Sequence, residues 1–270
     1  MSDRAPPVFD RAQTGATVLP RLSGLHATGP TRGGPPAEHP LAPDQNHLLE
    51  LLPAADLERL LGRCESVQLH LGDVLCEAGV PLPFAYFPVD GFISLLTRIE
   101  DHPSLEVGMV GREGLFGAAL VLGVAVSPLQ ALVQGAGQAW RLPAAALVRE
   151  LARSAALRQT LHRYVYVVMA QMASSAACLR FHLIGPRLAR WLLMSADRAH
   201  ASQFQVTHEF LACMLGVRRV GVTVAAGELQ RLGLIAYHRG RVTVLDRAGL
   251  EQAACPCYAR QHLAYQALLA

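Results

Sequence analysis

The stretch that decides the fold of the C-terminal part of the chain is THEFLACMLGVRRVGVTVAAGELQRLGLIAYHRGRVTVL, residues 207–245. Thr207 is placed to cap a short helix through its side-chain oxygen, and Glu209 in the first turn complements the helix dipole. The predicted buried face of this helix consists of Phe210, Leu211 and Met214. Gly216 permits a sharp turn, after which we predict a second helix that starts near Val217.

The second predicted helix has an apolar stripe at spacings of four and three residues, made by Val222, Ala226 and Leu229. Gly233 is expected to end this helix. Residues 234–237 and 241–245 then alternate as two short strands around a hairpin tip at His238-Arg239-Gly240. Two helices joined by a tight turn and followed by a β-hairpin form the pattern of a winged helix-turn-helix, a fold that binds DNA.

Positive charge occurs at two separate points of this segment. Arg218 and Arg219 stand at the start of the second helix, where recognition helices present side chains to base edges and phosphates. Arg239 and Arg241 flank the tip of the hairpin. Small apolar groups suit the methyl group of thymine. The predicted DNA-binding residues are therefore Arg218, Arg219, Val220, Thr223, Arg239 and Arg241.

Composition limits the remaining possibilities. The 270 residues are 51% hydrophobic and 17% charged, which predicts a compact fold with a sizeable core. The net charge of +3 permits nucleic acid as a partner but does not by itself indicate it, and all 24 basic residues are arginine. The sequence has no Gly-rich phosphate loop, metal-spaced His/Glu pair or nucleophile motif, so we do not expect an enzyme.

The longest apolar run, residues 115–126, is shorter than the roughly 20 residues that a membrane-spanning helix needs. The residues after Met1 include Asp3, Arg4 and two prolines, and they do not resemble a secretory signal. We therefore expect no membrane segment and a cytoplasmic location.

Upstream of the winged helix the chain divides into zones. Residues 1–44 are rich in Pro, Gly, Ala and Thr and lack periodicity, which predicts a disordered tail. Residues 45–150 begin with amphipathic helical turns broken by Pro53 and continue with about seven short β runs separated by turns. Strands at this spacing favour a β-sandwich or jelly-roll. We expect residues 185–258 to form the winged-helix domain and residues 259–270 to form a tail.

Residues 151–184 are predicted to form a long helix between these domains. Its apolar stripe recurs every three or four residues and consists of Leu157, Leu161, Tyr164, Val168, Met172, Ser175 and Leu179. Such a stripe would be exposed on a monomer. It therefore predicts a homodimer through a parallel helix pair.

Several motifs occur in order along the chain: Gly72-Asp73, the YFPVDG turn at 86–91, GREGLFG at 111–117, and the helix-turn-helix at 207–235. Together they resemble the Crp/Fnr family of bacterial transcription regulators. The resemblance implies an α+β chain with an N-terminal jelly-roll like a cyclic-nucleotide-binding domain, a long dimerisation helix and a C-terminal winged helix-turn-helix. It also implies double-stranded DNA, a second copy of the chain and RNA polymerase as partners.

The chain departs from the family where members that bind cyclic AMP hold its phosphate. The family's Gly-Glu-Leu turn matches at Gly117, but Ala118 replaces the glutamate, and Leu129-Gln130 stands where the phosphate-binding arginine is expected. An anionic phosphate without a cation would be poorly compensated. We therefore expect a degenerate effector pocket that does not bind cyclic AMP.

The recognition helix also departs from the family. The frequent Arg-Glu-x-x-x-Arg trio appears as Arg219-Val220-Gly221-Val222-Thr223-Val224 and keeps only its first arginine. A glycine inside a helix costs about 1 kcal/mol relative to alanine. Gly221 either allows a close approach to the phosphate backbone or is simply tolerated. The target sequence is therefore expected to differ from the usual family half-site.

The six cysteines suit reduced, mostly buried thiols better than a disulfide framework. The family's oxygen sensors carry an N-terminal cysteine cluster, and residues 1–63 contain no cysteine. Cys255-Pro256-Cys257 supplies only two ligands, whereas structural zinc takes four. Haem ligation by one of the 11 histidines stays open, although His70 and His162 favour surface exposure or ordinary packing. We predict neither a metal nor a cofactor.

The leading hypothesis is a sequence-specific, DNA-binding transcription regulator. The alternative is a ligand or redox sensor whose winged helix mediates protein contacts. An ordinary helical hairpin in an unrelated core is a third possibility for residues 207–245 alone. The arginines at both the helix start and the hairpin tip favour DNA, because an apolar protein contact has no use for charge at both points.

Overall fold

The computed structural model describes residues 46–269, so the tail expected at 1–44 lies outside the described residues. Helix α1 (His47–Glu50) and helix α2 (Ala54–Leu61) are separated at Pro53, as predicted. The fully buried Asn46 caps α1, and its side-chain amide donates to the carbonyls of Pro88 and Gly114 at 2.8 and 3.1 Å. This one side chain therefore ties the first helix to the strands that follow.

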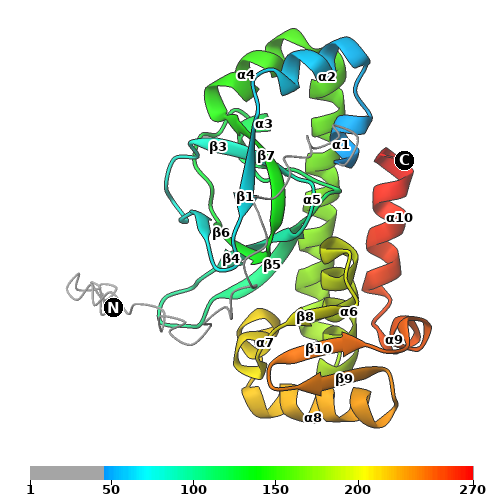
Figure 1. Ribbon diagram of the computed structural model, residues 1–270. Coiled ribbons are helices and arrows are strands. Elements are labelled where there is room, and N and C mark those ends of the chain that lie inside the picture. Colours follow the sequence, from blue (N-terminus) through cyan, green and yellow to red (C-terminus); the bar gives the residue numbers. More distant parts are fainter. Residues whose placement is uncertain (1–45, 270) are drawn as a thin grey trace, which may run out of the picture. The chain divides into compact units, whose positions relative to one another are not determined.

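About seven strands were predicted for this region, and the seven observed there form two antiparallel sheets (Figure 1). The first sheet has the order β1-β7-β3 and the second the order β2-β6-β4-β5. Their inward-facing side chains include the fully buried Phe87 and Ile93. The strands are β1 (Glu65–Leu69), β2 (Val74–Cys76), β3 (Phe84–Pro88), β4 (Phe92–Thr97), β5 (Leu105–Val110), β6 (Gln130–Gly135) and β7 (Gly137–Pro143).

Two helices of the β domain differ from what the sequence predicted. Helix α3 (Ala118–Val121) falls in the apolar run at residues 115–126 and begins with Ala118 of the expected effector pocket. Helix α4 (Ala144–Arg153) contains the boundary that we expected after residue 150. The true break is at Ser154, which caps the next helix by accepting from the amide of Leu157 at 3.0 Å.

The long helix α5 (Ala155–Phe181) is present, but the face predicted for dimerisation points into the molecule. Leu157, Leu161 and Tyr164 are buried in the core of the β domain, and Val168 and Met172 pack partly against it. The prediction that this stripe packs against a second copy is therefore wrong, because its apolar side chains pack against the sheets of the same chain. The residues that α5 leaves exposed include Tyr166 and Met169, each with 63% of its surface accessible.

The C-terminal residues expected to be a tail form a helix instead. After α9 (Arg247–Ala253), helix α10 (Cys257–Leu269) runs beside α5 (Figure 1). Leu269 is buried, and Tyr265 packs partly against the same core as the strands. The prediction failed because α10 has only a weak apolar pattern of its own, and its order comes from contact with α5.

Helix α6 (Ile184–Ala199) joins the β domain to the C-terminal elements. Gly185 and Pro186 form part of its first turn, where proline is tolerated. Leu188 and Leu192 are fully buried. The core around them takes in side chains of β4 and β5 on one side and of the helix-turn-helix on the other, among them Phe92, Leu96, Met109, Leu211, Val222 and Leu229.

Two polar contacts accompany this apolar core. Glu113, within the GREGLFG motif, accepts from Arg198 of α6 at 2.7 Å. Glu106 of β5 accepts from the indole of Trp191 on α6 at 2.9 Å and from the hydroxyl of Ser94 at 2.5 Å. Because buried polar groups need partners, both contacts favour one position of α6 against the sheet.

Among residues 46–269, no single helix is long and apolar enough to cross a membrane. The helices at His208–Leu215 and Arg219–Arg231 pass that test only as a pair, and the pair is bent by 107°.

Glu106 makes the stability of the fold depend on pH. Burial raises the pKa of Glu106 to about 7, although the hydrogen bonds from Ser94 and Trp191 and the charges of Arg198 and Arg190 favour the carboxylate. A raised pKa means that the folded state favours the neutral carboxyl. The contribution of Glu106 to the free energy of unfolding is therefore complete below pH 4.5, the ordinary pKa of a glutamate. It is lost as the pH rises through about 7.

We expect the unfolding free energy of the wild type to fall relative to that of Glu106→Gln by up to about 3 kcal/mol between pH 4.5 and 8. The amide cannot ionise, so the variant lacks this dependence, and the difference between the two proteins isolates Glu106 from the histidines. Urea unfolding across that pH range measures it. Parallel pH profiles for the two proteins would contradict the prediction.

Candidate nucleic-acid interface

Helix α7 (His208–Leu215) begins as the sequence indicated. The Thr207 side chain accepts from the backbone amide of Phe210 at 3.1 Å, and Glu209 lies in the first turn. Leu211 and Met214 are buried, as predicted, whereas Phe210 is only half-buried and meets the ring of Trp191 edge-on at 6.4 Å between centroids. The α7 helix is therefore packed on α6 through its apolar face.

The turn after α7 sets the direction of the next helix. Gly216 has a φ of +60°, a left-handed conformation that glycine adopts without strain, and it ends α7. Arg187 of α6 is buried and donates to the carbonyl of Leu215, which satisfies one of the free carbonyls at the helix end. Helix α8 (Arg219–Arg231) then starts two residues later than predicted, bent by 107° from α7. This angle is typical of a helix-turn-helix.

Gly221 in the first turns of α8 has a structural reason that the sequence did not show. A Cβ atom at this position would lie 2.7 Å from Cδ1 of Ile184, at the start of α6. Glycine therefore lets α8 pack closely against α6. On the inner side of α8, Val222, Ala226 and Leu229 are buried, as their spacing predicted.

The predicted hairpin is present and belongs to a three-stranded sheet. Strands β9 (Ile235–His238) and β10 (Arg241–Val244) pair with each other, and β8 (Gln203–Gln205), which the sequence analysis missed, pairs with β10. Arg239 and Gly240 at the tip have φ values of +48° and +77°. Positive φ at both central residues is typical of the type I′ turn of tight hairpins.

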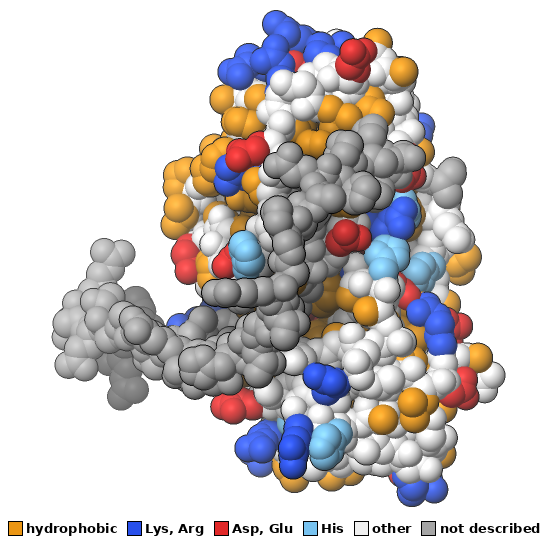
Figure 2. Space-filling view, in the orientation of Figure 1, with side chains coloured by type: hydrophobic (Ala, Val, Ile, Leu, Met, Phe, Trp, Pro, Cys, Tyr) orange, Lys and Arg blue, Asp and Glu red, His pale blue; other side chains and the backbone are white. Residues whose placement is uncertain are grey.

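All six predicted DNA-binding residues lie on the surface. Arg218 precedes α8, Arg219, Val220 and Thr223 follow in its first turns, and Arg239 and Arg241 flank the hairpin tip. Val220 exposes 66% of its surface. Within the described chain, none of the four arginines forms a salt bridge. Figure 2 shows arginine and histidine side chains gathered where α8 and the hairpin lie.

A small network joins α7, α8 and the hairpin behind this surface. The Thr223 hydroxyl donates to the carbonyl of Arg219 at 3.1 Å and lies 3.0 Å from Nδ1 of His208. The His208 ring stacks on Tyr237 of β9 at 4.3 Å between centroids. Burial, and to a smaller extent the charge of Arg219, lowers the pKa of His208. The neutral form of the His208 imidazole, which the lowered pKa favours, does not repel the charge of Arg219.

The four residues of the expected effector pocket all lie in the β domain, two at the start of α3 and two at the start of β6. Gly117 has a φ of +121° and precedes Ala118, the first residue of α3. Leu129 is half-buried, and Gln130 donates from its side-chain amide to the carboxylate of Glu77 at 2.8 Å. At the position expected to match the family's arginine, the side-chain amide of Gln130 is therefore bonded to the carboxylate of Glu77.

The structure overturns the argument that Cys255 and Cys257 lack further ligands. Cys178 and His182, at the end of α5, have side-chain atoms within 4.8 Å of both cysteines. The signal in the sequence was the four-residue spacing of Cys178 and His182, which places both on one face of a helix end. Sequence alone could not show that a pair more than 70 residues away would join them.

Comparisons with known proteins bear on the winged helix and on the whole chain. The family model of the Crp-like helix-turn-helix domain matches residues 186–253. A solved Crp/Fnr-family transcriptional regulator from Thermus thermophilus is 26% identical, with a TM-score of 0.59 over 70% of this chain and 98% of its own. The transcriptional regulator SdrP of the same organism is 27% identical over 206 residues, 70% of this chain and 94% of its own.

Residues 186–253 form a Crp-like helix-turn-helix domain, and the chain is similar to Crp/Fnr-family regulators over 70% of its length. Its α+β fold also matches a Crp/Fnr-family structure from Eubacterium rectale, with a TM-score of 0.62 over 78% of this chain and 98% of the other. At 15% identity, that likeness shows the fold alone. Within the matched residues 186–253, α7 and α8 are the two helices of the helix-turn-helix. The family resemblance drawn from the sequence is confirmed.

Proposed function

We propose that this protein is a Crp/Fnr-type transcription regulator that recognises a specific sequence in double-stranded DNA, with α8 in the major groove and the β9–β10 hairpin along the backbone. The observation that carries the proposal is the pairing of two exposed positive positions, Arg218 and Arg219 at the start of α8 and Arg239 and Arg241 at the hairpin tip. Two such positions suit phosphates on either side of a groove. They disfavour the alternative of an apolar protein contact.

Each residue has a distinct role in this proposal. Arg219, on the exposed face of α8, reads a base edge, and Val220 contacts a thymine methyl group. The hydroxyl of Thr223 is already bonded to the carbonyl of Arg219, so any contact of Thr223 with a base comes from its methyl group. Arg218 lies where the free amides of the helix start also favour a phosphate. Arg239 and Arg241 contact phosphates from the hairpin.

If Arg219 reads a base, Arg219→Ala should cost about 1–3 kcal/mol on the specific site and relax the preference at one position per half-site. Arg218→Ala, Arg239→Ala and Arg241→Ala should instead weaken binding to all duplexes alike and reduce the salt slope by about one unit per lost contact. Gel shifts on a selected and a random duplex at two salt concentrations measure both effects.

The matched control is Arg231→Ala, because Arg231 is exposed on the last turn of α8 and is already paired with Glu228 at 2.6 Å. It should leave both affinities unchanged. An equal loss of specific and nonspecific affinity in Arg219→Ala would show that Arg219 reads no base. Unchanged binding in all four arginine variants would contradict the DNA interface itself.

We also propose a homodimer, now through the exposed face of α5. His162, Tyr166, Met169, Ala173, Ala176 and Arg180 are exposed and recur at alternating spacings of four and three. This is the heptad pattern of a two-stranded coiled coil, and the alanines permit close approach of the two helices. Two copies of α8 would then face two inverted half-sites whose centres lie about 10 to 10.5 base pairs apart.

Met169→Glu should shift the protein from dimer to monomer in sedimentation, because it places a charge in the centre of this seam. Its fold should persist, since Met169 is already 63% exposed within the chain. The matched control is Val148→Glu on α4, where the side chain is 49% exposed and outside the seam. A dimer that withstands Met169→Glu, or a wild type that is monomeric at micromolar concentration, would rule out this interface.

The effector pocket is proposed not to hold cyclic nucleotides. The proposal is supported by Ala118 and Leu129 in place of polar ligands and by the Gln130–Glu77 contact, which puts a carboxylate beside the expected phosphate position. A phosphate there would meet negative charge.

Contact with RNA polymerase remains an expectation from the family resemblance.

Calorimetric titration of the protein with cyclic AMP and cyclic GMP should therefore give no specific binding. The same titration of the Glu77→Gln variant should also show no binding, because removing the carboxylate does not supply the missing cation. Micromolar affinity of the wild type for either nucleotide would contradict the proposal.

A further inference from the structure

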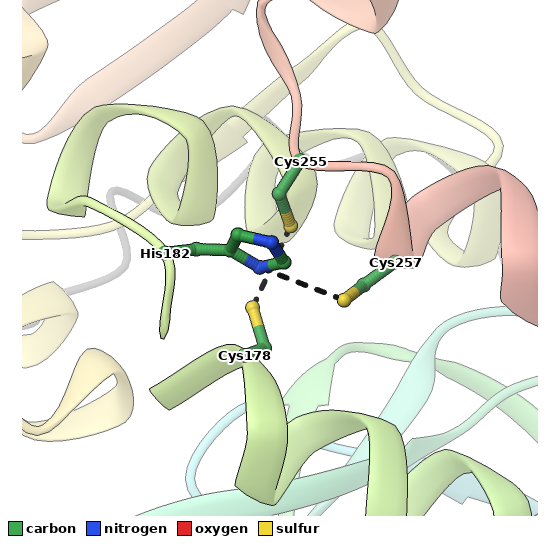
Figure 3. Close-up of side chains that lie close together, drawn as sticks. All are labelled: Cys178, His182, Cys255 and Cys257. Carbon is green, nitrogen blue, oxygen red and sulfur yellow. Dashed lines mark hydrogen bonds between the residues drawn. The ribbon is translucent and has the colours of Figure 1, made fainter. Parts of the chain in front are cut away.

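Four side chains with metal-binding atoms converge at the break between α5 and α6. Cys178 and His182 come from the end of α5, and Cys255 and Cys257 come from the segment that leads into α10 (Figure 3). Each offers one ligand atom, and these four atoms all lie within 4.8 Å of one another. All three cysteines are buried, with 2–3% of their surface accessible, and His182 is half-buried.

The distances fit one metal ion better than a disulfide. The Sγ atoms of Cys178 and Cys255 are 3.5 Å apart, and Sγ of Cys257 lies 3.7 Å from Nδ1 of His182. Tetrahedral zinc with Zn–S bonds of about 2.3 Å and Zn–N bonds of about 2.0 Å places its ligand atoms about 3.5 to 3.8 Å apart. A disulfide requires about 2.05 Å between sulfurs.

Ordinary core packing does not explain the group. The three cysteines form a separate buried cluster that belongs to neither of the two large apolar cores. Together with His182 they provide three thiolates and one imidazole, and Cys3His is among the ligand sets of structural zinc sites. Three thiolates and a divalent ion leave one negative charge. Arg187 and Arg190 lie close enough to these thiols to interact with them electrostatically and to offset that charge.

We propose that Cys178, His182, Cys255 and Cys257 bind one Zn²⁺ ion in a closed, tetrahedral structural site. Four protein ligands leave no open position for water, so the ion holds the fold and performs no reaction. Thiolate ligands select zinc over the hard cations that prefer oxygen.

The site would fasten three elements at one point. His182 ends α5, and α6 begins two residues later at Ile184. The backbone amide of Cys255 donates to the carbonyl of Pro186 in the first turn of α6 at 3.2 Å, and Cys257 is the first residue of α10. Bound zinc would therefore fix the angle at the α5–α6 break and hold the start of α10 against it. Of these, α5 and α6 connect the β domain to the helix-turn-helix.

The test measures metal in the purified full-length protein, without DNA. We expect about one zinc per chain by mass spectrometry of the metal content. Protein stripped by a chelator under reducing conditions should take up one equivalent of Zn²⁺ in competition with a chromophoric chelator. With Co²⁺ in its place, the spectrum should show the intense visible bands of tetrahedral, thiolate-ligated cobalt.

Cys178→Ser and Cys255→Ser should each lower zinc affinity by at least about tenfold, since each removes one ligand. The matched control is Cys64→Ser, because Cys64 is half-buried and outside the cluster. It should retain one zinc. Stripping the wild type should also expose the α9–α10 segment to limited proteolysis, and added zinc should restore its protection.

Three results would overturn the proposal, and none depends on a variant that folds. The first is a reduced, stripped wild type that takes up no zinc. The second is a Cys178–Cys255 disulfide in the protein as purified, without metal. The third is a protein that carries iron and inorganic sulfide, which would mean a cluster in place of a single ion.

Discussion

The packing of α6 is the constraint on which the arrangement of the molecule depends. Leu188 and Leu192 are fully buried in a core that takes in β4 and β5 of the β domain as well as α7 and α8 of the helix-turn-helix. Burial of a leucine side chain contributes roughly 1.5–3 kcal/mol, so this shared core is a substantial part of what holds the two regions together. The position of the recognition helix is therefore fixed through α6 and not by contacts of α8 alone.

A consequence is that the β domain and the DNA-binding helices are physically coupled. Glu106 and Glu113 reach from the β domain to Trp191 and Arg198 of α6, and Arg187 of α6 reaches to the end of α7. A change in the strands that altered these contacts would move α6 and with it α8. The proposed zinc site lies at the start of the same helix. It would limit such motion at the α5–α6 break.

Local sequence signals predicted the parts of the fold that depend on neighbouring residues. The Thr207 cap, the Gly216 turn and the buried stripe of Val222, Ala226 and Leu229 all follow from short-range patterns, and the family resemblance supplied the order of domains. Signals that depend on contacts between distant segments were missed or misassigned. The apolar stripe of α5 does not by itself indicate whether a sheet of the same chain or a second copy packs against it. In this structure the sheets of the same chain do.

The same limit applies to the candidate sites. Gly221 packs against Ile184, some 37 positions away, and the four proposed zinc ligands come from two segments that meet only after folding. Helix α10 was not predicted because its apolar residues show no strong helical periodicity. Its order comes mainly from packing against α5. Residue type and exposure at the predicted DNA interface were easier to anticipate, since recognition helices carry their contacts in sequence order.

The central claim is that α8 reads a specific DNA sequence, and selection from a random duplex library with the purified protein tests it most directly. The account predicts recovery of an inverted repeat whose half-site centres lie about one helical turn, 10 to 10.5 base pairs, apart. Recovery of duplexes with no common sequence, bound no more tightly than the starting library, would contradict it.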